Sequence, residues 1–200
     1  MINNVSGVIL AGGTGKRFNG VVKSKISIGG KSIISRIIDT MDSLFKEIII
    51  VTNSPEEYAE YDRCELVTDT FTGKGPLGGI HAAMNISEND ALFVIGGDMP
   101  FIDRDLIKRQ SEYYLANRCD VLIPFVDGLT EPLHSIYSCS VFKILDSYLG
   151  SSDQYSIRGF IKLTDHKYFT IDSSKEVLKA FTNINSPEDL ELVNRLYGLK

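Results

Sequence analysis

The residues of this 200-residue chain that could do chemistry begin in a glycine-rich stretch near the amino terminus. Residues 5–20 read VSGVILAGGTGKRFNG and hold five glycines, with Lys16 and Arg17 among them and Lys23 shortly after. Glycines that follow a strand let backbone N–H groups approach phosphate oxygens without interference from a Cβ atom. The stretch therefore indicates a phosphate cradle, and the alternative is a tight strand-to-helix turn that binds no ligand.

Two familiar phosphate-binding patterns do not fit this stretch. A Walker A loop, G-x-x-x-x-G-K-[ST], would need its first glycine at Leu10 or Lys25, and a dinucleotide-binding G-x-G-x-x-G would need its third at Phe18. What remains is the general rule that open α/β sheets bind ligands at the carboxyl ends of their strands.

Further candidate residues follow later apolar runs. Asp98 comes after the run 91–95 and two glycines, in FVIGGDMPFI, while Asp69 ends the run 64–69 and precedes the turn GKGPLGGI at residues 73–80. Carboxylates beside a polyphosphate are typical Mg²⁺ ligands. We therefore expect Asp98 to bind Mg²⁺, the alternative being a helix cap, and we expect Asp69 and the turn to lie at the same edge.

The elements that must position these residues alternate along the first half of the chain. Short runs rich in Val and Ile predict strands buried on both faces, at residues 5–11, 47–53, 64–69, 91–98 and 119–125. Apolar stripes and caps predict helices at residues 32–44, 54–61, 76–86 and 103–117, with Ser54 and Asp103 as N-caps. Strand alternating with helix indicates βαβ units and a parallel sheet.

The second half alternates less regularly. Residues 131–138 and 167–172 predict strands, and residues 140–150, 156–163 and 186–198 predict helices, the last of which begins at Ser186. We expect one domain over residues 1–200, with a nucleotide-binding half at 1–105 and a substrate-binding half at 106–200.

Composition narrows the class of protein. The 21 basic and 26 acidic residues give a net charge of −5, which argues against nonspecific nucleic-acid binding, yet six basic residues precede the first carboxylate, Asp39. That cationic segment suits a compact polyanion, and the alternative is a solvated basic face. No apolar run approaches the ~20 residues of a membrane span, so we expect a cytoplasmic protein without membrane contact. Cys64, Cys119 and Cys139 lack metal-site spacing and are expected to be buried thiols.

Assembled, these motifs resemble the molybdenum cofactor guanylyltransferase family of nucleotidyltransferases. The family pattern has LAGG, a basic residue, a lysine, GPLAG, a G-D-x-P aspartate and a closing N-x-N-S-P-E. Its counterparts here are residues 10–13, Arg17, Lys23, residues 75–79 (GPLGG), residues 97–100 (GDMP) and residues 183–189 (NINSPED). The resemblance covers nearly the whole chain, and the combination of the last three motifs is its most specific part.

The resemblance implies an α/β fold, a Rossmann-like three-layer sandwich with a mostly parallel central sheet, of the nucleotide-diphospho-sugar transferase type. It implies Mg²⁺ as cofactor and transfer of GMP from GTP to the terminal phosphate of molybdopterin, with pyrophosphate released. Catalytic roles would fall on Lys23, Arg17 and Asp98. Nucleotide-binding roles would fall on Leu10, Ala11, Gly12, Gly13, Gly15, Lys23, Asp69, Gly75 and Asp98. Gly79, Asn183 and Asn185 would bind the pterin substrate, and Asp98 the metal.

Other functions stay open at this point. The chain departs from the family pattern at Val22, Phe18 and Val51, where some members have an acidic residue, a methionine and an asparagine, respectively. A cytidylyltransferase or sugar-phosphate nucleotidyltransferase of the same fold is the nearest alternative. A non-catalytic module that binds nucleotide or cofactor is another. Expected partners are GTP and molybdopterin, with a transient contact to cofactor-delivery or molybdoenzyme maturation proteins also open, and neither nucleic acid nor membrane.

Overall fold

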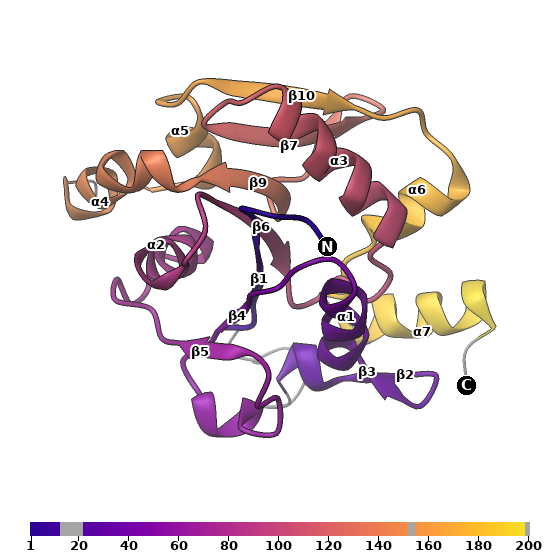
Figure 1. Ribbon diagram of the computed structural model, residues 1–200. Coiled ribbons are helices and arrows are strands. Elements are labelled where there is room, and N and C mark those ends of the chain that lie inside the picture. The colour runs from indigo at the N-terminus through magenta and orange to yellow at the C-terminus, as the bar shows by residue number, and fades with distance from the viewer. Residues whose placement is uncertain (13–21, 152–154, 199–200) are drawn as a thin grey trace.

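The computed structural model describes residues 1–12, 22–151 and 155–198 and shows a central sheet covered by helices on both faces (Figure 1). The strand order is β10-β7-β9-β6-β1-β4-β5, and β8 pairs with β7. The strands are β1 (Ser6–Leu10), β4 (Ile48–Val51), β5 (Glu65–Val67), β6 (Ala91–Gly96), β7 (Val121–Val126), β8 (Leu129–Thr130), β9 (His134–Ser138) and β10 (His166–Thr170). A separate hairpin joins β2 (Ser27–Ile28) to β3 (Lys31–Ser32).

Most neighbours in this sheet are parallel. Strand β1 pairs in parallel with β4 and β6, β4 with β5, and β7 with β10. Strand β9 runs antiparallel to both β6 and β7 and lies between them. The carboxyl ends of β1, β4, β5 and β6 therefore meet at one edge, and the amino end of β9 meets them there.

The helices form the two outer layers. They are α1 (Ile33–Asp42), α2 (Pro76–Ile86), α3 (Arg104–Ala116), α4 (Phe142–Ser151), α5 (Ile157–Ile161), α6 (Lys175–Ala180) and α7 (Pro187–Tyr197). One core cluster joins α1, α3 and α7 to one face of the sheet, and a second joins α2, α4 and α5 to the other. Figure 1 shows the same two groups on opposite sides of the strands. This is the predicted three-layer sandwich.

The strands fill both cores because successive side chains point to opposite faces. Along β1, Val8 packs in the second cluster and Ile9 in the first, and along β6 Val94 and Ile95 divide in the same way. All four side chains are fully buried. A strand that is buried on both faces needs an unbroken apolar run, which explains why these strands could be read from the sequence.

Two predicted caps, Asp103 and Ser186, are confirmed, and Ser32 caps α1 in the same way without having been predicted. The side chains of Ser32, Asp103 and Ser186 each accept a hydrogen bond from a backbone N–H in the first turn of α1, α3 and α7. Asp189 completes a capping box at α7, since its carboxylate accepts the backbone N–H of Ser186 at 2.9 Å. The predicted starts of these helices are therefore set by local side-chain chemistry.

The predicted helix at residues 54–61 is wrong. The structure has a single 3₁₀ turn, η3 (Pro55–Tyr58), and the side chain of Ser54 does not cap it. Tyr58 is the one buried residue of this turn, so no apolar stripe supports a longer helix. The β2–β3 hairpin, β8 and α6 had no predicted counterpart in the sequence.

Two cysteines lie where they were expected. Cys64 and Cys119 are buried, Cys139 is half-buried, and all three are free thiols. No helix in the parts of the chain that the structure describes is long and apolar enough to cross a membrane.

His134 is a fully buried histidine whose ring lies among other aromatic rings. Its ring packs against the rings of Phe93 and Phe181, with centroids 5.1 and 4.9 Å away, and neither ring nitrogen has a hydrogen-bond partner among the described residues. Burial lowers the pKa of His134 to about 4, and the charge of Asp103 opposes this shift only in part. The ring is therefore neutral in the folded protein at pH 7.

We expect this histidine to weaken the fold in acid. Unfolded His134 binds a proton at a pKa near 6.5 and the folded form at about 4, so between these values the unfolded state holds more protons. The free energy of unfolding should then fall as the pH drops from 6.5 to 4, by about 3 kcal/mol in total from this residue. Urea titrations at pH 7 and pH 4.5 of the wild type and His134→Leu measure the difference, and equal losses in both would contradict the prediction.

Candidate active site

A pocket of about 350 Å³ lies at the edge where β1, β4, β5 and β6 end. Its lining brings together most of the residues that the sequence predicted for the site, from segments far apart in the chain. These residues are Leu10, Ala11, Gly12, Lys23, Asp69, Gly75, Gly79 and Asp98. The structure brings these residues together around one pocket, and their roles in binding a ligand remain predictions.

Three predicted residues cannot be placed. Gly13, Gly15 and Arg17 lie outside the described residues. The described part of the glycine-rich stretch is residues 5–12, which hold all of β1 together with Ala11 and Gly12. The Ala11 N–H donates to the carbonyl of Val51 at 2.8 Å, which holds the start of this stretch against the end of β4.

The turn after β6 packs closely on the end of β1. The Gly97 N–H donates to the Leu10 carbonyl at 3.0 Å. A Cβ atom at Gly97 would lie 2.9 Å from that carbonyl oxygen and 3.4 Å from the Cβ of Ser24. Only glycine allows this approach. The close packing brings Asp98, the next residue, to the same pocket as Ala11 and Lys23.

Lys23 and Asp98 form the charged centre of the pocket. The Lys23 ammonium lies 3.6 Å from Asp98 Oδ2, and each side chain is about one quarter exposed, at 23% and 25%. Burial raises the pKa of the Asp98 carboxyl, and the charge of Lys23 opposes that rise. The pair therefore presents one cation and one carboxylate to the pocket, partly shielded from water.

The segment before α7 closes on this pair. Lys23 Nζ donates a hydrogen bond to Asn185 Oδ1 at 2.8 Å, and the Ile184 N–H donates to the Asp98 carbonyl at 2.9 Å. Asn185 is exposed and Asn183 is half-buried, and neither is among the residues that line the pocket. Of the two predicted asparagines, Asn185 therefore contacts the Lys23–Asp98 pair directly, and Asn183 lies two residues before it in the same segment.

Asp69 stands on the other side of the pocket, two residues after β5. Its N–H donates to Asn53 Oδ1 at 3.4 Å. Burial raises the pKa of Asp69, and a hydrogen bond from Asn53 lowers it. Asn53 also lies 3.8 Å from the place of a Cβ atom on Gly12, so it links the end of β4 to both neighbouring segments.

The GPLGG turn, residues 75–79, contributes three residues to the pocket lining: Gly75, Pro76 and Gly79. Gly75 precedes α2 with a φ of 61°, a left-handed conformation that favours glycine, and α2 begins at Pro76. A Cβ atom at Gly79 would lie 2.9 Å from Leu10 Cδ2 and 3.4 Å from Asp69 Oδ1. The first turn of α2 thus packs directly on Leu10 of β1 and close to the carboxylate of Asp69.

Several residues of the pocket lining were not predicted from the sequence. Ser24 follows Lys23 and is 2% exposed, Asn53 lies two residues after Val51, and Leu133 falls in the range 131–138 that was predicted as a strand. Leu133 reaches the pocket because β9 runs antiparallel to β6, and the Gly96 N–H donates to its carbonyl at 3.1 Å. The position of Ser24 next to Lys23 was a usable signal, whereas Leu133 had none.

Comparison with known proteins identifies the family. The sequence profile of the MobA-like NTP transferase domain matches residues 7–167. The chain belongs to this family. A probable molybdenum cofactor guanylyltransferase of Natranaerobius thermophilus is 34% identical, over 99% of this chain and 98% of its own length. Another, of Pyrococcus furiosus, is 34% identical over 93% and 94% of the two chains. The chain is thus a nucleotidyltransferase.

Solved structures of related fold agree with the architecture of this family member. Molybdopterin-guanine dinucleotide biosynthesis protein A of Archaeoglobus fulgidus superposes with a TM-score of 0.81 at 23% identity, covering 96% of this chain and 98% of that one. The 4-diphosphocytidyl-2C-methyl-D-erythritol synthase of Anaerococcus prevotii gives 0.71 at 14%, covering 97% and 96%. At these identities the likeness shows the fold.

The pocket of this nucleotidyltransferase suits a magnesium ion that a nucleotide brings with it. Among the described residues no three His, Cys, Asp or Glu side chains gather into an all-protein metal site. Mg²⁺ in nucleotide enzymes usually takes one or two carboxylates and completes its shell with water and phosphate oxygens. Asp98 and Asp69 both line the pocket, so the carboxylate donors fit that arrangement.

Proposed function

We propose that this protein transfers GMP from GTP to the terminal phosphate of molybdopterin and releases pyrophosphate, forming the guanine dinucleotide form of the cofactor. The proposal is supported chiefly by the pairing of Lys23 with Asp98 in a pocket at the carboxyl edge of a mostly parallel sheet. It is supported further by relatives at 34% identity that carry the name molybdenum cofactor guanylyltransferase.

The proposed reaction needs no nucleophile from the protein. An oxygen of the substrate phosphate forms a bond to the α-phosphorus of GTP, and the bond from that phosphorus to the bridging oxygen of the β-phosphate breaks, so that pyrophosphate leaves with the electron pair. The work of the protein is alignment and charge stabilisation. In our proposal the Lys23 ammonium stabilises the charge that grows on pyrophosphate.

Asp98 would hold Mg²⁺ in its carboxylate form. The ion, when bound, would neutralise phosphate charge and so lower the barrier to the transfer. Burial favours the protonated form of Asp98, and Lys23 at 3.6 Å favours the carboxylate. Lys23 therefore serves the proposed site twice, once toward the leaving group and once by keeping Asp98 charged.

The remaining predicted residues take their roles from the family pattern. The nucleotide would lie along the ends of β1, β5 and α2, in contact with Leu10, Ala11, Gly12, Asp69 and Gly75. Gly13, Gly15 and Arg17 would hold the triphosphate. Gly79, Asn183 and Asn185 would face the pterin. The hydrogen bond between Asn185 and Lys23 supports this division, because it places the 183–185 segment next to the phosphate-binding cation.

Thermal unfolding with separate nucleotides tests the proposal. We expect GTP with Mg²⁺ to stabilise the protein more than CTP, UTP or ATP, since a ligand at about 100 times its dissociation constant adds roughly 2.7 kcal/mol to the folded state. Removal of Mg²⁺ with EDTA should abolish the difference. Pyrophosphate release from GTP in the presence of molybdopterin then tests the transfer itself.

Two outcomes would replace the proposal with one of its alternatives. Selective stabilisation by CTP would assign the protein to cytidylyl transfer. Selective GTP binding without any pyrophosphate release in the presence of molybdopterin would indicate a module that binds nucleotide without turnover.

A further inference from the structure

Tyr58, a residue outside the pocket lining, connects two segments of the pocket through its hydroxyl group. It is the last residue of η3 and is 0% exposed. Its hydroxyl donates to the Ala11 carbonyl at 3.3 Å and lies 2.6 Å from the hydroxyl of Ser24. A phenol has a single proton to donate. Because that proton goes to Ala11, Ser24 must donate to Tyr58, and the three groups form one chain of hydrogen bonds.

Both ends of this chain belong to the proposed nucleotide site. Ala11 and Ser24 line the pocket, and Ser24 is joined through the backbone to Lys23. In the sequence they flank residues 13–21, so Tyr58 contacts the polypeptide on each side of that segment. Gly97 packs closely against the same two residues. A Cβ atom placed on Gly97 would lie 3.3 Å from Ala11 Cα and 3.4 Å from Ser24 Cβ.

We propose that Tyr58 is a positioning residue for nucleotidyl transfer, whose hydroxyl holds the Lys23–Ser24 backbone in register with Ala11 at the end of β1. This inference rests on the proposed function for its effect on turnover. Buried hydrogen bonds of this kind are costly to break, because the groups left behind have no water to replace the lost partner. Loss of the hydroxyl should therefore free the backbone that carries Lys23.

Lys25 gives the short 3₁₀ turn η2 (Lys23–Lys25) a second attachment to the residues of and after η3. Its ammonium lies over the rings of Tyr58 and Tyr61, at 5.4 and 5.9 Å from their centroids, and pairs with Glu60 at 2.9 Å. These contacts involve the faces of the two rings and do not need either hydroxyl. A Tyr-to-Phe change at Tyr58 or Tyr61 therefore keeps the cation–π contact and removes only the hydroxyl.

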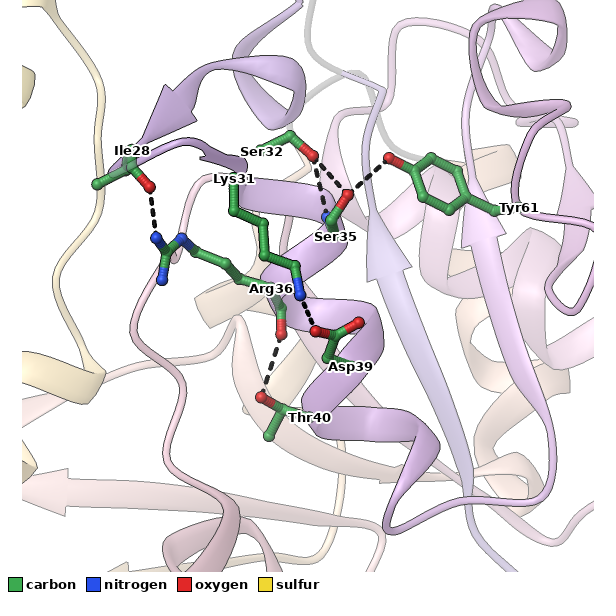
Figure 2. A network of polar contacts seen from close by, with 8 residues as sticks. All are labelled: Ile28, Lys31, Ser32, Ser35, Arg36, Asp39, Thr40 and Tyr61. Carbon is green, nitrogen blue, oxygen red and sulfur yellow. Dashed lines mark hydrogen bonds and ion pairs between the residues drawn. The ribbon is translucent and has the colours of Figure 1, made fainter.

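Tyr61 provides a matched control. Its hydroxyl lies 3.0 Å from the hydroxyl of Ser35 in α1, which in turn bonds to the N-cap Ser32. Figure 2 shows Tyr61 directed toward this helix. Tyr61 shares Lys25 with Tyr58, yet its hydroxyl bonds to α1, and none of its partners lines the pocket. Tyr58→Phe and Tyr61→Phe each remove one hydroxyl from a tyrosine that packs against Lys25. The Tyr58 hydroxyl bonds to Ala11 and Ser24 of the pocket, whereas the Tyr61 hydroxyl bonds to Ser35 of α1.

The experiment compares Tyr58→Phe, Tyr61→Phe and the wild type in pyrophosphate release and in hydrogen exchange. We expect Tyr58→Phe to lower kcat about five- to tenfold, the effect of one lost hydrogen bond, with KM for GTP changed less than kcat. Tyr61→Phe should leave both constants within about twofold. Amides of residues 22–28 should exchange faster in Tyr58→Phe than in Tyr61→Phe.

A double variant tests whether Tyr58 acts through Ser24. If both hydroxyls belong to one chain, Tyr58→Phe combined with Ser24→Ala should lose little more than Tyr58→Phe alone. Losses that multiply would overturn the coupling, and equal kcat values for Tyr58→Phe and Tyr61→Phe would overturn the positioning role. A wild type that releases no pyrophosphate would contradict the proposed function instead, and equal exchange of residues 22–28 in the two variants would then still overturn the inference about Tyr58.

Discussion

Replacing Lys23 with alanine is expected to lower the rate of nucleotidyl transfer by ~10²–10³, the usual effect of removing one charged transition-state contact. Lys23 is the cation that the structure places against Asp98 in the pocket, and in the proposed mechanism it meets the leaving pyrophosphate. Its ion pair is partly exposed, so the free energy of unfolding should change little. Steady-state pyrophosphate release and urea unfolding measure the two effects separately.

The pH dependence of the same variant gives a second readout. Burial raises the pKa of Asp98 and Lys23 opposes that rise, so removal of the lysine should raise the pKa further. If Asp98 must be ionised for activity, the acid limb of the pH–rate profile should then move to higher pH. An acid limb at the same pH in the variant and the wild type would mean that ionisation of Asp98 does not produce that limb.

Lys31→Ala is the control for Lys23→Ala. Lys31 belongs to the same basic amino-terminal segment, but its ammonium pairs with Asp39 on α1, as Figure 2 shows. It does not line the pocket. Its removal should leave turnover unchanged. Normal turnover in Lys23→Ala would remove Lys23 from the mechanism, and equal losses in both variants would indicate a general effect of positive charge.

The substitution Asp98→Asn is expected to abolish activity together with the response to Mg²⁺. Asparagine has nearly the shape of aspartate, so the Ile184 hydrogen bond to the backbone carbonyl of residue 98 can persist. What is lost is the negative charge that a divalent cation requires. In the wild type, stabilisation by GTP should rise as Mg²⁺ is added, and in the variant it should stay flat across the same titration.

Asp105→Asn serves as the matched change for Asp98→Asn. Asp105 is an exposed aspartate in the first turn of α3, with a side chain that is 83% exposed. This variant should keep the wild-type response to Mg²⁺ and the wild-type rate. A wild-type Mg²⁺ titration in Asp98→Asn would place the metal on another residue, and Asp69 would be the next to test because it lines the same pocket.

The strands that build the site could be predicted because burial on both faces leaves a strong local signal. Residues 91–95 are an unbroken apolar run, followed by two glycines and Asp98, and β6 occupies Ala91–Gly96. The predicted cap Asp103 is confirmed at α3 because capping is a local interaction within one turn. The same rule failed at Ser54, where a suitable cap precedes a segment without an apolar stripe.

The amino-acid sequence by itself therefore determined the long buried strands, most of the helix starts and the set of polar residues that follow the strands, since each depends on near neighbours in the chain. Only the tertiary structure decided which of them meet. The antiparallel direction of β9 brings Leu133 to the pocket, the fold of η3 brings Tyr58 to Ala11 and Ser24, and the segment before α7 brings Asn185 to Lys23. These contacts join residues 30 to 160 positions apart in the sequence, roughly, and contacts of that separation depend on the packing of the whole chain.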